Sequence, residues 1–249
     1  MLLDGKRALV TGAGRGIGSA IARRLASEGA CVALAYRHSR SGAEALAEEL
    51  RALGVRAECF QADLTSPVEA KRLVEASVNF LGGLDILVNN AAGFGPLQPL
   101  ATQPWDEIDE EWRAVVQPVH LVTQAALPTF FEEGSGAIVN LSATLLQRPA
   151  PGQGAHAMAK AAILAYTRTL ARELGPQRIR VNAVSPGMTE TEWTLSQPEE
   201  LRVAVAGRTP LRRLATPDDV AGAVLFFCSP LSAFVTGANL APDGGLATL

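Results

Sequence analysis

The sequence predicts an α/β domain in which a doubly wound parallel sheet of about seven strands carries helices on both faces. Short apolar runs alternate with helix-like stretches along the chain, which is the pattern of parallel strands joined by crossover helices. The apolar runs do not alternate strictly with polar residues, as strands buried on both faces require. No Gly/Ser-rich linker or run of like charges divides the chain, so residues 1–249 are expected to form one domain.

Strands are expected where short apolar runs lie between turn-forming residues. Helices are expected where apolar residues recur every three or four positions, as Ile17, Ile21 and Leu25 do. In chain order the elements are a strand at 7–10, a helix at 16–27, a strand at 31–36, a helix at 42–53, a strand at 57–61, a helix at 67–81, a strand at 84–89, a strand at 137–141, a helix at 155–174, a strand at 179–184, a helix at 217–227 and a strand at 238–241. The stretch 189–209 is the least regular and suits a mobile substrate lid.

The composition argues against several classes of protein. The net charge of −3 offers no basic excess for a nucleic acid. No run of about 18 apolar residues predicts a membrane span, and the start MLLDGKRALVTGAG interrupts the apolar core that a signal peptide needs. The three cysteines are widely spaced and form no CxxC, so they are expected to be reduced thiols of a cytoplasmic protein rather than a metal site.

A glycine-rich turn follows the first predicted strand, at residues 11–18 (TGAGRGIG). Gly12, Gly14, Gly16 and Gly18 allow the backbone to approach a pyrophosphate closely. The helix that starts there offers unpaired N–H groups and the positive end of its dipole. A glycine cluster alone is weak support, but this one lies between a strand and a helix of a βαβ unit. The turn therefore predicts a Rossmann-like dinucleotide-binding domain.

The end of the second strand bears on the choice of dinucleotide. A domain that prefers NAD(H) usually has an acidic residue there, which binds the ribose hydroxyls. This chain has Tyr36-Arg37-His38 instead. Arg15 and Arg37 could clamp a 2′-phosphate, since the guanidinium fork suits phosphate, although both could also be solvated surface residues. We expect NADP(H) to be preferred over NAD(H).

With these residues in view, nearly the whole chain resembles the short-chain dehydrogenase/reductase family. The glycine turn resembles the TGxxxGxG motif of that family, and residues 89–93 (NNAAG) resemble its NNAG motif with one additional Ala. Residues 181–187 (VNAVSPG), followed by Thr191, resemble its VNxVxPGxxxT segment, and Asp63 resembles its adenine-side Asp. The resemblance implies that the cofactor is held by Gly12, Gly14, Arg15, Gly16, Ile17, Gly18, Arg37, His38, Asp63, Leu64, Asn90, Ala91, Lys160, Pro186, Gly187, Met188, Thr189 and Thr191.

The resemblance also implies a catalytic set of Asn, Ser, Tyr and Lys, and here the chain departs from the family. Lys160 matches the family Lys, but His156 occupies the position of the Tyr that exchanges the substrate proton. The usual spacing before His156 places Ala143 at the Ser position, and matching residues 121–128 (LVTQAALP) to the similar stretch of the family places Val115 at the Asn position. The motifs for the cofactor are thus retained, whereas the usual oxyanion stabilisation and proton relay are not.

Three residues are candidates for the altered chemistry. His156 and Lys160 are four apart on a predicted helix and share a face. An imidazole can donate an N–H, accept a proton or act as a general base. Ser142 precedes Ala143 and would point away from the substrate in a regular strand, whereas a bulge would turn it inward. We therefore take His156, Lys160 and Ser142 as the candidate catalytic residues.

The leading hypothesis is an NADPH-dependent reductase that acts on a carbonyl or on an activated C=C or C=N bond of a small molecule. Two alternatives stay open: a non-redox cyclase, dehydratase or isomerase on the same scaffold, and a catalytically silent subunit. Mostly apolar pocket candidates allow an aromatic or polyketide-like substrate; they are Phe94, Leu97, Leu145, Gln147, Met188 and Trp193.

The family resemblance implies a homo-oligomer, a dimer or a tetramer, assembled through the helices near 105–127 and 155–174. Pro118 falls inside the first of these helices. Proline has no N–H and clashes with the preceding turn, so a kink is expected there.

Overall fold

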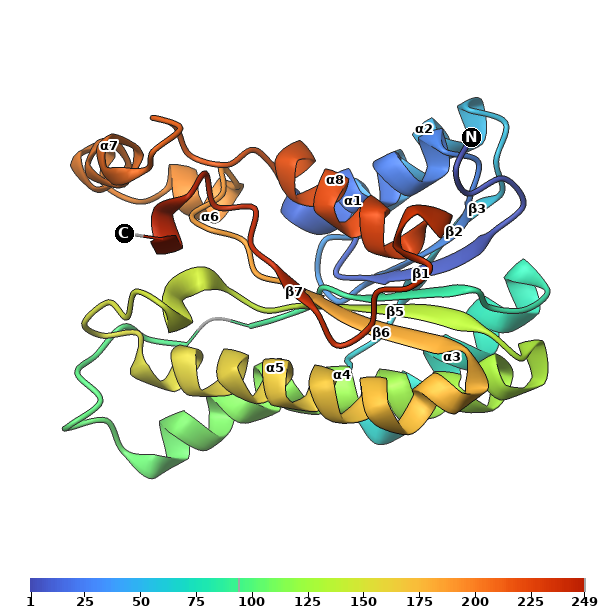
Figure 1. The fold of residues 1–249 in the computed structure, drawn as a ribbon, viewed down its shortest axis with the longest axis horizontal. Helices are drawn as coiled ribbons and strands as arrows, with labels where there is room; N and C mark the ends of the chain where they lie inside the picture. The colour runs from blue at the N-terminus through green and yellow to red at the C-terminus, as the bar shows by residue number, and fades with distance from the viewer. Residues whose placement is uncertain (94, 249) are drawn as a thin grey trace.

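The computed structural model describes residues 1–93 and 95–248, and within them it contains one seven-stranded sheet of order β3-β2-β1-β4-β5-β6-β7 (Figure 1). All neighbouring strands are parallel. The strands are β1 (Arg7–Thr11), β2 (Cys31–Tyr36), β3 (Ala57–Gln61), β4 (Ile86–Asn89), β5 (Gly136–Leu141), β6 (Ile179–Val184) and β7 (Asn239–Leu240). The doubly wound α/β fold is therefore confirmed.

The main helices form two layers. Helices α1 (Gly16–Ser27), α2 (Arg40–Ala52) and α8 (Pro217–Cys228) cover one face of the sheet, and α3 (Pro67–Leu81), α4 (Trp105–Glu133) and α5 (Gly154–Leu174) cover the other (Figure 1). Two short helices, α6 (Glu192–Leu195) and α7 (Glu199–Arg208), occupy most of the stretch expected to be a lid. That stretch is thus largely helical, and its role as a lid stays a prediction.

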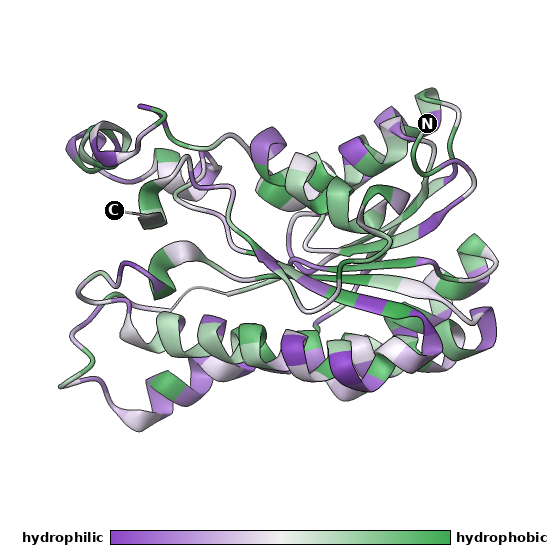
Figure 2. Ribbon diagram, in the orientation of Figure 1, coloured by the Kyte–Doolittle hydropathy of each residue, from purple (hydrophilic) through white to green (hydrophobic). Residues whose placement is uncertain are grey.

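Strands β1 to β6 contribute to two hydrophobic cores, one on each side of the sheet. In β1, Ala8 and Val10 pack under α1 and α8, while Leu9 packs on the other side with α3 and α4. In Figure 2 the strands in the middle of the sheet are mostly hydrophobic, and hydrophilic residues are concentrated in the surrounding helices and loops. Burial on both faces explains why the strand sequences are continuously apolar.

Helix α4 is longer than expected and continues through Pro118 and Pro128. Proline at 118 has no N–H to give to the carbonyl of Ala114, four residues earlier. The N–H of Gly93, in the loop after β4, donates to that carbonyl instead, at 3.2 Å. The proline therefore does not end the helix, and it provides an acceptor for the loop.

The ends of the other elements differ from the sequence expectation by a few residues. Strand β4 begins at Ile86, and helix α2 begins at Arg40. Among the described residues, no helix is both long enough and apolar enough to cross a membrane.

Candidate active site

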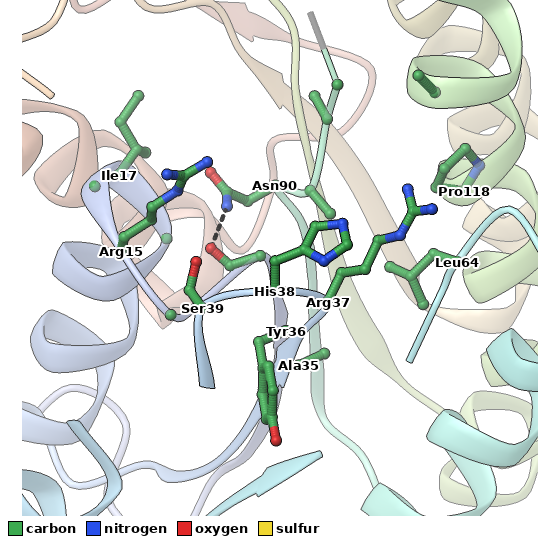
Figure 3. A pocket seen from close by; sticks show the side chains of 18 of the residues that line it. Arg15, Ile17, Ala35, Tyr36, Arg37, His38, Ser39, Leu64, Asn90 and Pro118 are labelled. Carbon is green, nitrogen blue, oxygen red and sulfur yellow. Dashed lines mark hydrogen bonds between the residues drawn. The ribbon is translucent and has the colours of Figure 1, made fainter. Parts of the chain in front are cut away.

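A cleft of about 470 Å³ opens at the carboxyl ends of β1, β2 and β4. The chain reverses its direction of progress along the sheet between β1 and β4, and ligands of doubly wound sheets bind at such a switch point. The cleft brings together most of the predicted cofactor residues: Gly12, Gly14, Arg15, Gly16, Ile17, Gly18, Arg37, His38, Asp63, Leu64, Asn90, Ala91 and Thr191 (Figure 3). The other predicted contacts, Lys160, Pro186, Gly187, Met188 and Thr189, lie outside its described lining.

The glycine turn is packed too tightly for side chains. A Cβ on Gly18 would lie 2.1 Å from the carbonyl oxygen of Gly12, and one on Gly14 would lie 2.7 Å from that of Ser39. Helix α1 starts directly after Arg15, which makes no side-chain cap with any described residue, and the first turn contains no acidic residue. The N–H groups and the positive dipole end therefore remain to bind an anion, which fits a dinucleotide pyrophosphate.

Asn90 fastens this turn to the end of β4. Its Nδ2 donates to the carbonyls of Thr11 (2.8 Å) and Gly12 (3.2 Å), and it lies directly beside the turn in Figure 3. The hydroxyl oxygen of Thr11 accepts the N–H groups of Asn90 (2.9 Å) and Ala91 (3.0 Å). These bonds give Asn90 and Thr11 a structural role in shaping the cleft.

Basic side chains line the rim beyond β2. Arg15 lies near Asn90, and Arg37 extends on the other side of His38 (Figure 3). Arg37 forms an ion pair with Asp63 at 2.8 Å, although 56% of its side chain is exposed. Burial disfavours the charged form of Asp63, but hydrogen bonds from the N–H and hydroxyl of Thr65 and the charge of Arg37 outweigh it and lower the pKa of the carboxyl.

The predicted catalytic residues lie where β5 meets α5. His156 is in the first turn of α5, and Lys160 follows one turn later. Lys160 is 6% exposed, and its Nζ donates to the carbonyl of Leu141 at 2.9 Å. Burial lowers the pKa of this amine to about 8, and the negative charge of Glu111 acts in the opposite direction.

Ser142 is buried, and its hydroxyl donates to the backbone carbonyl of Lys160 at 2.9 Å. The hydroxyl is thus used to join β5 to α5, and Ser142 is absent from the described lining of the cleft. The structure gives it a bracing contact; a contact with substrate stays a prediction. Val115, expected at the position of the family Asn, is buried with Val119, Ala159 and Ile163 in apolar packing.

The sequence analysis missed one polar residue beside His156, which is Glu111 on α4. We call the group formed by Glu111, His156 and Lys160 the catalytic corner. Its Oε1 lies 2.5 Å from Nδ1 of His156, and its Oε2 accepts the N–H of Gly95 at 2.7 Å. Only 3% of the Glu111 side chain is exposed. The acidic residues near Glu111 in the sequence are at least partly exposed, so the sequence does not distinguish the buried Glu111 from them. The available signal was its place one helical turn before Val115, on the same face of the helix.

A chain of buried polar contacts holds α4 and α5 in place on the sheet. Nδ2 of Asn89, at the end of β4, donates to Thr123 of α4 (3.0 Å) and to Asn140 of β5 (2.9 Å). Nδ2 of Asn140 donates in turn to Thr167 of α5 (2.9 Å). Because buried polar groups are costly when unpaired, these bonds fix how far each helix can slide along the sheet.

The pocket candidates fall in different places. Trp193 lines the cofactor cleft, and Leu97 lies with Glu111 and His156 around a much smaller cavity. Leu145, Gln147 and Met188 line neither of these cavities within the described lining, and Phe94 lies outside the described residues.

A glycine turn at a helix N-terminus, placed at the switch point of a doubly wound sheet, defines a dinucleotide-binding protein. The family model described as enoyl-(acyl carrier protein) reductase, adh_short_C2, matches residues 12–247. An uncharacterized oxidoreductase of Mycobacterium tuberculosis (strain CDC 1551 / Oshkosh) is 42% identical over 247 residues, which cover 98% of this chain and 93% of that protein. The chain belongs to the short-chain dehydrogenase/reductase family, as its motifs predicted.

Solved structures agree with this assignment. A short chain dehydrogenase from Burkholderia cenocepacia J2315 in complex with NADP is 40% identical, with a TM-score of 0.93 and 100% of both chains covered. A 7 alpha-hydroxysteroid dehydrogenase complexed with NADH and 7-oxo glycochenodeoxycholic acid is 34% identical, with a TM-score of 0.93, and the match covers 98% of this chain and 94% of that one. The protein is thus similar to oxidoreductases solved with either nicotinamide cofactor.

Proposed function

We propose that the protein is an NADP(H)-dependent oxidoreductase that acts on a carbonyl or on an activated C=C or C=N bond, with His156 exchanging the substrate proton. The observation that carries the proposal is the buried contact between His156 and Glu111, one helical turn from Lys160, in a protein whose cleft fits a dinucleotide. A site that had lost its chemistry would have no need of a buried acid and imidazole in contact, because burying them is costly. This contact favours a working site over a silent subunit.

The preference for NADP(H) is supported by the charge on the rim of the cleft. Arg15, Arg37 and His38 all line it, and no acid ends β2. The guanidinium of Arg37 would bind the 2′-phosphate from the place where it now contacts Asp63. A bound NADPH would supply the hydride, and the remaining steps are the work of the protein's own side chains.

Those side chains divide the work between holding the cofactor and moving the proton. Leu141 takes one N–H of Lys160, and the ammonium has further donors for the nicotinamide ribose hydroxyls. In the direction of reduction, the imidazolium of His156 gives its proton to the substrate atom that becomes negative. The neutral ring then recovers a proton from solvent, so the cycle is balanced.

The altered residues bear on the kind of substrate. Ala143 and Val115 offer no side-chain donor to a developing oxyanion. Loss of one such donor typically costs roughly 10²–10³ in rate. Acceptors that are already electron-poor, such as quinones, enones and iminium ions, need less of this help. We therefore expect them to be reduced faster than simple ketones.

The first experiment is a fluorescence titration with NADPH and NADH, followed by a screen of those acceptors that monitors NADPH oxidation. His156→Ala is expected to lower kcat by roughly 10²–10⁴ while the affinity for NADPH stays the same, since general acid–base catalysis contributes about that much. Unchanged turnover in His156→Ala would refute the proton role. Turnover without consumption of NADPH would favour the non-redox alternative instead.

A further inference from the structure

We infer that Glu111 is a positioning residue whose carboxylate fixes the imidazole proton of His156 on Nδ1. The substrate proton then passes through Nε2. The inference rests on the proposed function, because it describes how the proton-handling group of that site is set up. It gives a role to a residue that belongs to none of the motifs of the sequence.

Both oxygens of the Glu111 carboxylate are engaged. Oε1 lies 2.5 Å from Nδ1 of His156, and Oε2 accepts the N–H of Gly95 at 2.7 Å. The side chains of Glu111 and His156 are only 3% and 11% exposed. A carboxylate buried to this extent is costly unless it is hydrogen-bonded, and here each of its oxygens has a partner. The carboxylate is thus held from two elements, α5 and the loop after β4.

Gly95 makes this arrangement possible. A Cβ at this position would lie 2.7 Å from Oε2 of Glu111, so a larger residue would displace the carboxylate. A backbone N–H can only donate a hydrogen bond, and it therefore commits Oε2 to the role of acceptor. Oε1 is left for the imidazole.

The chemistry of the two groups then sets the position of the proton. An ionised carboxylate only accepts hydrogen bonds, so the nitrogen that contacts it must carry a hydrogen. Nδ1 of His156 keeps its hydrogen in both the neutral and the charged ring. When the imidazolium gives a proton to the substrate, the N–H bond that breaks is the one at Nε2. The ionised Glu111 stays in contact with the ring throughout and stabilises the imidazolium.

Glu111→Gln tests this assignment with almost no change of shape. The amide has one acceptor and one donor group, and the N–H of Gly95 requires the acceptor. The amide NH₂ must then face Nδ1, which becomes an acceptor, and the neutral ring carries its hydrogen on Nε2. The substitution should therefore switch the tautomer of His156.

The experiment is a ¹⁵N NMR measurement of the imidazole nitrogens in the protein with its histidines labelled, and it requires no turnover. We expect a protonated Nδ1 in the wild type and a protonated Nε2 in Glu111→Gln. With an acceptor found in the screen, kcat of this variant should fall on the order of 10²-fold, with the KM for NADPH unchanged. Asp109→Asn is the matched control. It removes a carboxylate from the same helix, but that carboxylate contacts only the exposed Arg113 among the ion pairs of the described residues. It should alter neither the tautomer nor kcat.

The outcomes separate the inference from the function on which it rests. A wild-type ring with a bare Nδ1 at neutral pH, or a tautomer that is the same in Glu111→Gln, would overturn the role of Glu111. A tautomer switch in a protein that oxidises NADPH with none of the acceptors would support the positioning role of Glu111 and contradict the proposed oxidoreductase function. A switch together with the loss of kcat supports both.

Discussion

The cofactor cleft and the catalytic corner are built in different ways. The cleft is made mostly of backbone: glycines, a helix N-terminus and the peptide groups bound by Thr11 and Asn90. The corner is made of side chains on α4 and α5, where Glu111 meets His156 across 45 positions of sequence. Under the proposed function, the cleft would bind the hydride carrier and the corner would transfer the proton, so the two tasks would be carried by separate parts of the fold.

The largest expected effect comes from distorting the glycine turn. Gly18→Val would place a side chain 2.1 Å from the carbonyl oxygen of Gly12 and 2.5 Å from Nδ2 of Asn90. We expect NADPH affinity to fall at least about 10²-fold, which corresponds to about 3 kcal/mol. A fluorescence titration measures this, and thermal unfolding monitors the fold. Gly222→Ala in α8 is the control, since nothing lies within 4 Å of its added Cβ. Normal NADPH binding by Gly18→Val would mean that the cofactor lies elsewhere.

A second prediction concerns the stability cost of the corner. The pKa of Lys160 is about 8 in the folded protein and near 10.5 in the unfolded chain. Between these values the unfolded chain binds more protons, so the free energy of unfolding rises as the pH increases from about 8 to about 10.5. Below pH 8 the amine is charged in both states, and burying it lowers the free energy of unfolding by about 3 kcal/mol.

Lys160→Met removes that charge, and it also removes the hydrogen bond to Leu141, which is worth about 1 kcal/mol. At pH 7 we expect a net gain of about 1–2 kcal/mol in the free energy of unfolding and a flatter dependence on pH above 8. Urea denaturation at several pH values is the measurement. Lys71→Met, at an exposed lysine, should change little. Equal pH profiles for wild type and Lys160→Met would show that Lys160 carries no such cost.

The smallest effect is expected at the rim of the cleft. Arg37→Ala should weaken NADPH binding about 10-fold, since a charge-assisted hydrogen bond contributes about 1.5 kcal/mol. NADH has no 2′-phosphate, so its affinity should stay the same. The matched control is Arg40→Ala, which removes an exposed arginine nearby that pairs with Glu44 on the same helix. Equal losses for NADPH and NADH would contradict a 2′-phosphate contact at Arg37.

The sequence predicted the cleft far better than the corner, for physical reasons. Close approach of the backbone to a ligand requires glycine, and the residues of a strand-to-helix turn are adjacent in sequence. The short segment 11–18 is therefore enough to predict the turn and its role. The partner of His156 depends on how α4 lies against α5, which tertiary packing decides. Glu111 also stands beside Glu110, which is exposed, and nothing local distinguishes the two. The same limit applies to Ser142, whose bond to the Lys160 carbonyl depends on the spacing between β5 and α5.

Pro118 frees the carbonyl of Ala114 from the helix, and the bond that this carbonyl accepts from Gly93 limits how the protein can be recombined with its relatives. Gly93 is attached to α4 at that carbonyl, and Gly95 is attached one turn earlier at Glu111. Gly93 lines the cofactor cleft, whereas Gly95 supports the partner of His156. A change of length between residues 95 and 111 would strain both attachments, and a crossover there would separate Gly95 from Glu111. Chimaeras should therefore exchange residues 93–114 as a single block of unchanged length.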